Sequence, residues 1–176
     1  MYKLPATLLA TALLTALQGC KPSDTPTHPA ARLAAAGFDA IAASCTQFLA
    51  DRTPQVHSSG PDTWVKVGHS PALVQHEVNP TESPITPFVG KIVIKDNEAL
   101  ATATTKASAQ AITLTPDHLL SNRTHTFIYS FDGQQWAWQN GQRLTKIPGQ
   151  NDTAVALTLA EVSASGPNGF ARCLPR

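Results

Sequence analysis

The stretch Thr126-Phe-Ile-Tyr-Ser-Phe-Asp-Gly-Gln-Gln-Trp-Ala-Trp-Gln139 decides the fold class of this chain. Its centre, Asp132-Gly133, is a residue pair preferred in tight two-residue turns between antiparallel strands. On both sides of the turn, apolar and polar side chains alternate, which is typical of a half-buried strand. The stretch therefore predicts a β-hairpin with strands at 126–131 and 135–139.

One face of this hairpin is aromatic. Successive side chains of a strand point to opposite faces, so each strand should gather its aromatic residues on one side: Phe127, Tyr129 and Phe131 on the first strand, Trp136 and Trp138 on the second. Such a face is commonly core beneath a helix. Because aromatic residues are also enriched at interfaces, Tyr129, Trp136 and Trp138 form, alternatively, a possible binding face for a sugar or a peptide.

Strand-like alternation recurs on both sides of the hairpin. Residues 88–95 alternate clearly and are expected to end at a turn at Asp96-Asn97, after which residues 99–107 would run back beside them. Asn140-Gly141 marks a second turn after the hairpin. Shorter strands are expected at 63–67, 73–78, 111–115 and 154–162, and the pattern of the last one also allows a helix.

An amphipathic helix precedes the strands. Apolar residues recur at steps of three and four from Leu33 to Leu49, and Pro54 stops the pattern. The predicted helix spans about residues 30–52, is weakened at Gly37, and carries Cys45 on its apolar face. One helix followed by five to seven antiparallel strands predicts an α+β fold, with the N-terminal helix packed on a curled sheet.

Two segments carry a loose resemblance to other exported proteins. Glu77-Val78 through Pro87-Phe88-Val89-Gly90-Lys91, followed by Tyr129-Ser130-Phe131-Asp132-Gly133-Gln134-Gln135-Trp136, is similar to a Ser-Pro-Tyr-Val-Gly … Tyr-x-Tyr-x-x-Gly-x-Trp pattern of uncharacterised exported proteins. The expected helix-on-sheet plan also resembles the cystatin-like and NTF2-like domains common among small periplasmic proteins. This resemblance implies a fold and carries no known activity.

The first twenty residues have the pattern of an export signal. Lys3 precedes an apolar run from Leu4 to Ala16, which suits a signal peptide and is shorter than the ~20 residues that a membrane-spanning helix needs. The run ends at Leu17-Gln18-Gly19-Cys20, which resembles the lipobox of bacterial lipoproteins. That resemblance implies cleavage after Gly19, a diacylglycerol on the thiol of Cys20, and commonly a third acyl chain on the new amino group.

The lipobox also implies an organisation of the chain and a location. Residues 1–19 would be removed, the proline-rich residues 20–29 would form a lipidated, flexible tether, and residues 30–176 would form a single periplasmic domain. Two or three acyl chains make a stable membrane anchor, and Lys21 after the lipidated cysteine favours the outer membrane. The alternative is an ordinary secretory signal with a coincidental cysteine, although Ala16-Leu17-Gln18 offers no small-x-small cleavage site.

The other two cysteines form an even pair once Cys20 is assigned to lipid. In an exported protein, Cys45 and Cys173 are expected to form a disulfide that ties the helix to the C-terminal tail. Two buried free thiols are the alternative. No histidine lies near either cysteine in the sequence, so a cysteine nucleophile is not indicated.

Metal-type ligands cluster at one place in the sequence, at His69, His76 and Glu77. Zinc motifs place two histidines one helical turn apart, which a separation of seven residues in a strand and loop does not reproduce. His76 and Glu77 would also face opposite ways on a strand. These residues are therefore interpreted as surface side chains, and no metal site is expected.

Acid–base chemistry has one group of candidates. Asp117, His118 and His125, together with Ser121, could form such a site if the fold brought them together. No nucleophile motif accompanies them. Because Asp117 follows Pro116, turn or helix-start chemistry explains it equally well.

Composition narrows the classes of function. The chain has 13 Lys and Arg against 12 Asp and Glu and is only 14% charged, which does not favour binding to nucleic acid. No cofactor motif is present. The expected function is that of a non-enzymatic, lipid-anchored envelope lipoprotein that binds another envelope protein or a polymer. The alternatives are a small envelope hydrolase with scattered acid–base residues and a phage or plasmid exclusion lipoprotein.

Overall fold

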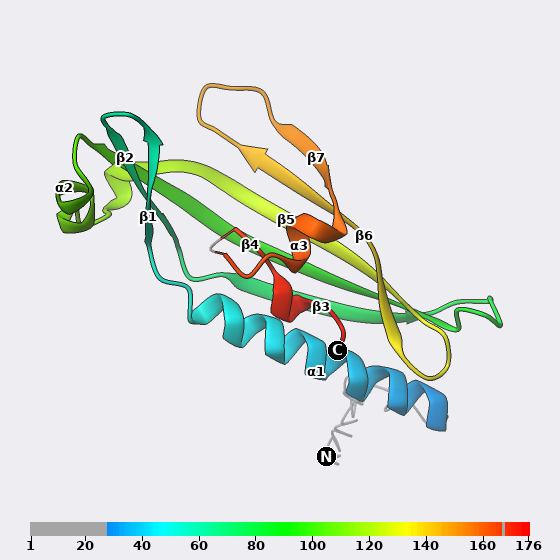
Figure 1. Cartoon of the computed structure of the whole chain (residues 1–176). Helices are drawn as coiled ribbons and strands as arrows, with labels where there is room; N and C mark the ends of the chain where they lie inside the picture. Colours follow the sequence, from blue (N-terminus) through cyan, green and yellow to red (C-terminus); the bar gives the residue numbers. More distant parts are fainter. Residues whose placement is uncertain (1–27, 167) are drawn as a thin grey trace, which may run out of the picture.

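The computed structural model describes residues 28–166 and 168–176, and it has the expected α+β architecture: one long N-terminal helix packed on an antiparallel sheet (Figure 1). The long helix is α1 (Pro29–Ala50), and the shorter helices are α2 (Lys106–Ala111), η1 (Pro116–His118), α3 (Leu159–Ser163) and η2 (Ala171–Cys173). The strands are β1 (Gln55–Gly60), β2 (Thr63–His69), β3 (Leu73–Pro80), β4 (Phe88–Ala103), β5 (Leu119–Phe131), β6 (Trp136–Lys146) and β7 (Thr153–Leu157). The predicted leader and residues 20–27 of the predicted tether lie outside the described residues.

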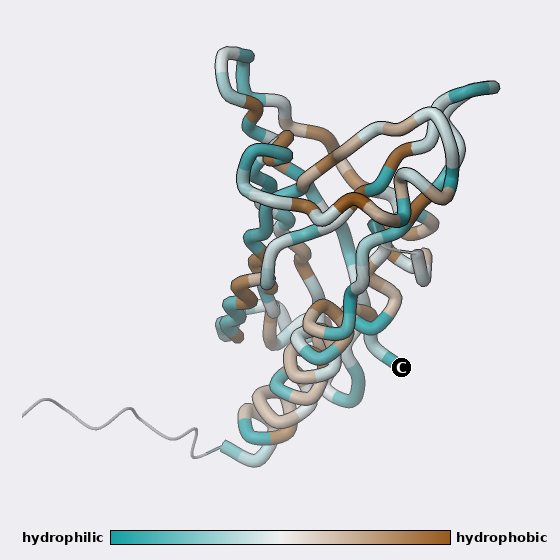
Figure 2. Tube along the Cα trace, turned by 90° about the vertical axis from the view of Figure 1, so that its left-hand side faces the viewer, coloured by the Kyte–Doolittle hydropathy of each residue, from teal (hydrophilic) through white to brown (hydrophobic). Residues whose placement is uncertain are grey.

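The sheet is built around one long strand, β4. Its order is β1-β2-β4-β5-β6-β7, and β3 also pairs with β4. The first half of β4 pairs with β3 and the second half with β2, all in antiparallel register. The helix α1 runs along one face of the sheet, and the C-terminal strap (residues 164–166 and 168–176) lies between the two (Figure 1). Figure 2 shows hydrophobic and hydrophilic residues alternating along the strands.

The predicted turn at Asp96-Asn97 is wrong, because β4 continues straight through it to Ala103. Asp96 lies opposite Arg123 of β5 in the sheet and forms ion pairs with Arg52 and Arg123, so its side chain is buried and held in place. These long-range contacts override the local turn preference. Residues 99–103 consequently extend the same strand instead of running back beside it.

The predicted turn at Asn140-Gly141 is also wrong, since β6 runs through it to Lys146. Gly141 lies directly against the ring of Phe127, and a Cβ at that position would be 2.9 Å from Phe127 Cδ1. The glycine therefore provides space for a core aromatic ring. Two other expectations need correction: residues 111–115 are not a strand, and residues 154–162 divide into β7 and α3.

The buried face of α1 forms the centre of the core. It comprises Ala34, Phe38, Ala42, Cys45 and Leu49, whereas Leu33, expected on this face, is 55% exposed. The Phe38 ring packs on Gly90. Its centroid lies 5.2 Å from the centroid of the Tyr129 ring and 4.6 Å from that of the Trp136 ring.

By length and composition alone, α1 is also the one helix among the described residues that could cross a membrane. In this structure, however, one side of α1 packs on the sheet and the other side faces outward, which is the arrangement of an amphipathic core helix.

The predicted disulfide is present between Cys45 of α1 and Cys173 of η2. Both cysteines are fully buried. The hydroxyl of Tyr129 donates a hydrogen bond of 2.7 Å to the carbonyl oxygen of Cys173. Together these contacts fix the C-terminal strap against the helix on one side and the sheet on the other.

Gly90→Ala is expected to lower the free energy of unfolding by about 1–3 kcal/mol, the usual cost of overpacking a core. An added Cβ at this position would overlap the ring of Phe38, which is fully buried. Urea unfolding measures the change. Gly60→Ala is the matched control, because the nearest atom to its Cβ would be 3.8 Å away. Equal stability of the two variants would contradict this description of the core.

Candidate functional site

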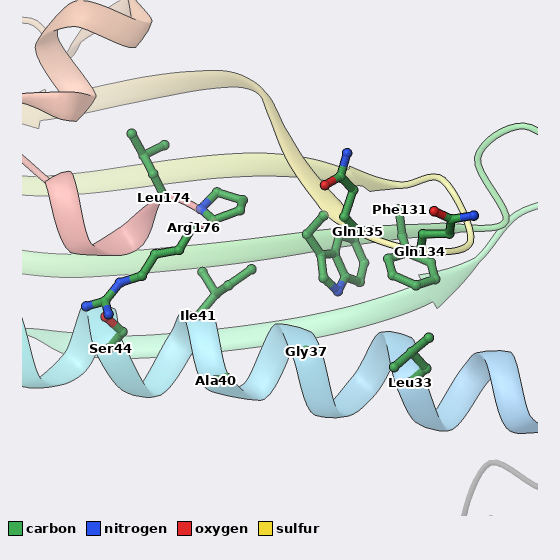
Figure 3. A pocket seen from close by; sticks show the side chains of 12 residues that line it. Leu33, Gly37, Ala40, Ile41, Ser44, Phe131, Gln134, Gln135, Leu174 and Arg176 are labelled. Atoms are coloured by element: carbon green, nitrogen blue, oxygen red, sulfur yellow. The ribbon is translucent and has the colours of Figure 1, made fainter.

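An open groove lies between α1, the β5–β6 hairpin and the end of the C-terminal strap (Figure 3). Its volume is about 440 Å³. The helix contributes Leu33, Gly37, Ala40, Ile41 and Ser44, the hairpin Phe131, Gln134, Gln135 and Trp136, and the strap Leu174, Pro175 and Arg176.

Three small helix residues leave space for the groove between the larger Leu33 and Ile41. Gly37, Ala40 and Ser44 lie three or four positions apart and so share one stripe of α1, next to the stripe that packs in the core. A Cβ at Gly37 would be 3.4 Å from Trp136 Cδ1, so glycine lets the indole lie close to the helix. The indole Nε1 donates a hydrogen bond of 2.9 Å to the carbonyl oxygen of Ala34, which fixes the ring as one wall.

The polar side chains of the groove carry no negative charge. Arg176 is the one ionisable side chain among the described lining residues, and Ser44, Gln134 and Gln135 are the other polar ones. The remaining lining residues are apolar or small. The groove can therefore accept apolar side chains together with an acidic or hydrogen-bond-accepting group.

The structure corrects the predicted aromatic binding face. Tyr129 is fully buried in the core, and burial raises the pKa of its hydroxyl. Trp138 is half-buried and packs on the core. A surface platform of Tyr129, Trp136 and Trp138 is thus wrong, because the core beneath α1 takes up these rings. Trp136 is only 7% exposed, yet it lines the groove.

The candidate acid–base residues do not converge. His118 closes the N-terminal cap of η1, where its Nδ1 lies 2.9 Å from Thr115 Oγ1, and Asp117 is exposed beside it. His125 lies in β5, six residues after that strand begins at Leu119, which is about 20 Å at ~3.3 Å per strand residue. Ser121 and His125 are buried. These positions do not favour an acid–base site built from this group.

The predicted metal-type residues are also dispersed into separate pairs. Nδ1 of His69 lies 2.8 Å from Arg123 Nη2, Nε2 of His76 lies 2.9 Å from Asp39 Oδ1, and Glu77 pairs with Lys91. Within residues 28–166 and 168–176, no three ligating side chains gather in a group that could hold a metal ion.

A buried ionic cluster, which sequence reasoning missed, lies beneath the strap. It comprises Arg52 just after α1, Asp96 and Glu98 of β4, and Arg123 of β5. Arg123 binds Asp96 in a two-pronged arrangement, with Nε and Nη2 at 3.0 and 2.8 Å from the two carboxylate oxygens. Burial alone would raise the pKa of Asp96, but the hydrogen bonds and charge of Arg123 outweigh it and hold that pKa below its ordinary value.

The ionic cluster also holds the strap. Arg52 Nη2 donates a hydrogen bond of 2.7 Å to the carbonyl oxygen of Gly169, and its guanidinium lies 4.7 Å from the centroid of the Phe170 ring. Arg123 Nη1 lies 3.4 Å from the side-chain oxygen of Asn168. Burial lowers the pKa of Arg52 to about 10, and Asp96 opposes that effect. The cluster therefore has a structural role, since it positions the strap that forms one wall of the groove.

Stability is expected to fall by about 2 kcal/mol between pH 7 and pH 5 because of His125. Burial lowers the pKa of this side chain from 6.5 to about 3; Asp96 opposes the effect, and Arg123 and Arg143 add to it. Below pH 6.5 the unfolded chain thus binds a proton that the folded chain does not, which favours unfolding as the pH falls. Urea unfolding at pH 7, 6 and 5 measures this slope. The His125→Gln variant should have a flatter slope; an unchanged slope would contradict the assignment.

Comparison with models of protein families, with curated proteins and with solved structures finds no match to this chain. The groove and the N-terminal sequence are therefore the features of this chain that bear on its function.

Proposed function

We propose that this chain is a non-enzymatic, lipid-anchored envelope lipoprotein that binds an apolar segment of another envelope protein in the groove along α1. The observation that carries the proposal is the groove itself: an open, mostly apolar hollow with Leu33 55% exposed at its helix wall. Exposed apolar surface that is concave and rimmed by polar groups is typical of protein-binding sites. The dispersal of the acid–base candidates supports a binding role over hydrolysis.

The anchor in this proposal is Cys20 with its acyl chains. Eight residues, 21–28, separate Cys20 from the start of α1. A chain of this length spans at most about 30 Å. The domain would therefore stay close to the membrane, with the Leu33 end of the groove nearest to the anchor along the chain. Lys21 after the lipidated cysteine supports the outer membrane as the location.

The proposed partner segment has a defined chemistry. It presents bulky apolar side chains to Trp136, Ile41 and Leu174, and an acidic side chain to Arg176. The described lining residues offer the charge of Arg176 and no carboxylate side chain. A basic segment would therefore bring like charges together across the interface, which is costly, and an acidic segment would not. No specific geometric feature favours the hydrolase or exclusion hypotheses.

Cys20→Ala tests the anchor. The variant is expected to accumulate as an unlipidated precursor that is larger than the mature protein and incorporates no labelled palmitate. Membrane fractionation and intact-mass measurement follow the change. Normal processing and membrane retention in this variant would refute lipidation at Cys20 and leave the groove hypothesis to its own test.

Ala40→Arg tests the groove. Ala40 is exposed and lines the groove, so the longer side chain fills it without entering the core. Ala43→Arg is the matched control, since Ala43 is an exposed alanine of the same helix that does not line the groove. Crosslinking in the native envelope should yield one anchor-dependent partner that is lost in Ala40→Arg and kept in Ala43→Arg, with unchanged thermal stability in both. An equal yield in the two variants would exclude the groove as the binding site.

A further inference from the structure

A second cavity lies on the same side of the sheet, between β5, β6 and β7 on one side and α3 and the strap on the other. Its volume is about 270 Å³. The strands provide His125, Arg143 and Leu157 to its wall, α3 provides Val162, and the strap provides Phe170. None of these five residues lines the groove along α1.

Two nitrogen-bearing side chains stand next to each other in this cavity. His125 of β5 is paired directly with Arg143 of β6 in the antiparallel register, so their side chains project from the same face as neighbours. His125 is 2% exposed, and its ring lies 4.6 Å, centroid to centroid, from the ring of Phe170. Arg143 is half-buried.

The imidazole of His125 has an unsatisfied hydrogen-bonding atom. Its Nδ1 is buried and has no hydrogen-bond partner among the described residues. Leaving such a group without a partner costs about 1–3 kcal/mol, and buried polar atoms in native proteins almost always have one. An acceptor in the cavity would satisfy the Nδ1–H tautomer. His125 lines the cavity, so a hydrogen-bond acceptor bound there is a candidate partner for this nitrogen.

Arg143 supplies the positive charge that an anionic ligand would need. Glu161 is the one acidic side chain among the lining residues, and its carboxylate accepts hydrogen bonds of 2.7 Å from the backbone nitrogen and the hydroxyl of Thr158. That carboxylate is therefore committed to the cap of α3, although it still interacts electrostatically with Arg143. A guanidinium binds carboxylate groups through paired hydrogen bonds, which are stronger than neutral ones.

We propose that this cavity binds a small aliphatic carboxylate, whose carboxylate group lies between Arg143 and His125 and whose apolar body packs on Leu157, Val162 and Phe170. The cavity is too small for a large ligand, and Leu157, Val162 and Phe170 give it three bulky apolar side chains. This ligand is independent of the partner segment proposed for the groove, and either proposal can fail alone.

Isothermal titration of the full-length lipoprotein in detergent with butyrate tests the site, with butyramide as the neutral ligand of nearly the same shape. Saturable binding of butyrate but not of butyramide is expected. Arg143→Gln should weaken butyrate binding at least about tenfold, the loss of one charge-assisted hydrogen bond. Arg172→Gln, at an exposed arginine of η2 outside the cavity, should leave it unchanged.

The imidazole of His125 supplies a second readout. Butyrate should shift the ¹⁵N resonance of Nδ1 in the wild-type protein and not in Arg143→Gln, provided that both have the same thermal stability. No saturable binding of butyrate up to about ten millimolar would overturn the proposal, because a site with one charge-assisted pair should bind within that range. Equal affinity of butyrate and butyramide, or of wild type and Arg143→Gln, would overturn it as well.

Discussion

Replacement of both Cys45 and Cys173 by alanine is expected to lower the free energy of unfolding by about 4–5 kcal/mol. The disulfide joins residues 128 positions apart, and closing so long a loop removes much of the conformational entropy of the unfolded chain. It also fastens the strap residue Leu174, which forms one wall of the groove. We therefore expect the double variant to lose partner binding together with stability.

Urea unfolding of the oxidised protein, the reduced protein and the double variant measures this effect. Reduced wild type and the double variant should unfold at similar, much lower midpoints, since both lack the crosslink. A difference of less than about 1 kcal/mol between oxidised wild type and the variant would contradict the role assigned to the disulfide.

Arg123→Met is expected to destabilise the protein by about 3–5 kcal/mol, the cost of removing one partner from a buried ion pair. The substitution leaves Asp96, whose side chain is fully buried, with Arg52 as its remaining ionic partner. It also removes the contacts of Arg123 to Glu98 and Asn168, and so loosens the strap.

A double-mutant cycle with Asp96→Asn isolates this interaction. The double variant should be less destabilised than the sum of the two single variants, because each single change leaves the other charge buried and poorly paired. Arg172→Met is the matched control at an exposed arginine. Strict additivity of the two substitutions would show that Arg123 and Asp96 do not stabilise each other.

The elements with strong local patterns could be predicted from the sequence. The hairpin around Asp132-Gly133, the amphipathic helix α1 and the Cys45–Cys173 disulfide are confirmed. Each rests on a signal that the sequence itself carries: turn chemistry, a periodicity of three to four, or an even pair of cysteines behind a predicted export signal.

The errors occur where distant residues outweigh local preference. Asp96-Asn97 has turn composition, but Arg123 and Arg52, 27 and 44 residues away, hold Asp96 inside the sheet. Gly141 sits in β6 because the ring of Phe127 needs its space. A pattern read along the chain contains neither contact.

The groove along α1 and the cavity beside His125 also could not be predicted from the sequence, because each depends on distant segments. The groove depends on Gly37 and Ala40 being small at the place where the strap and Trp136 lie beside α1, which only the folded arrangement determines. The aromatic pattern did locate Trp136, and of its two interpretations the core beneath a helix holds for Tyr129, whereas the alternative binding face would have needed an exposed Tyr129. His125 was noted for acid–base chemistry, while its pairing with Arg143 follows from the register of β5 and β6.

Photo-crosslinking in living cells, from a photoreactive phenylalanine analogue placed at Ala40, is the sharpest test of partner binding in the groove. The same analogue at Ala43 is the control, because both positions are exposed on α1 and only Ala40 lines the groove. One discrete adduct with an envelope protein is expected from position 40 and none from position 43. Adducts of equal yield from both positions, or from neither, would contradict partner binding in the groove.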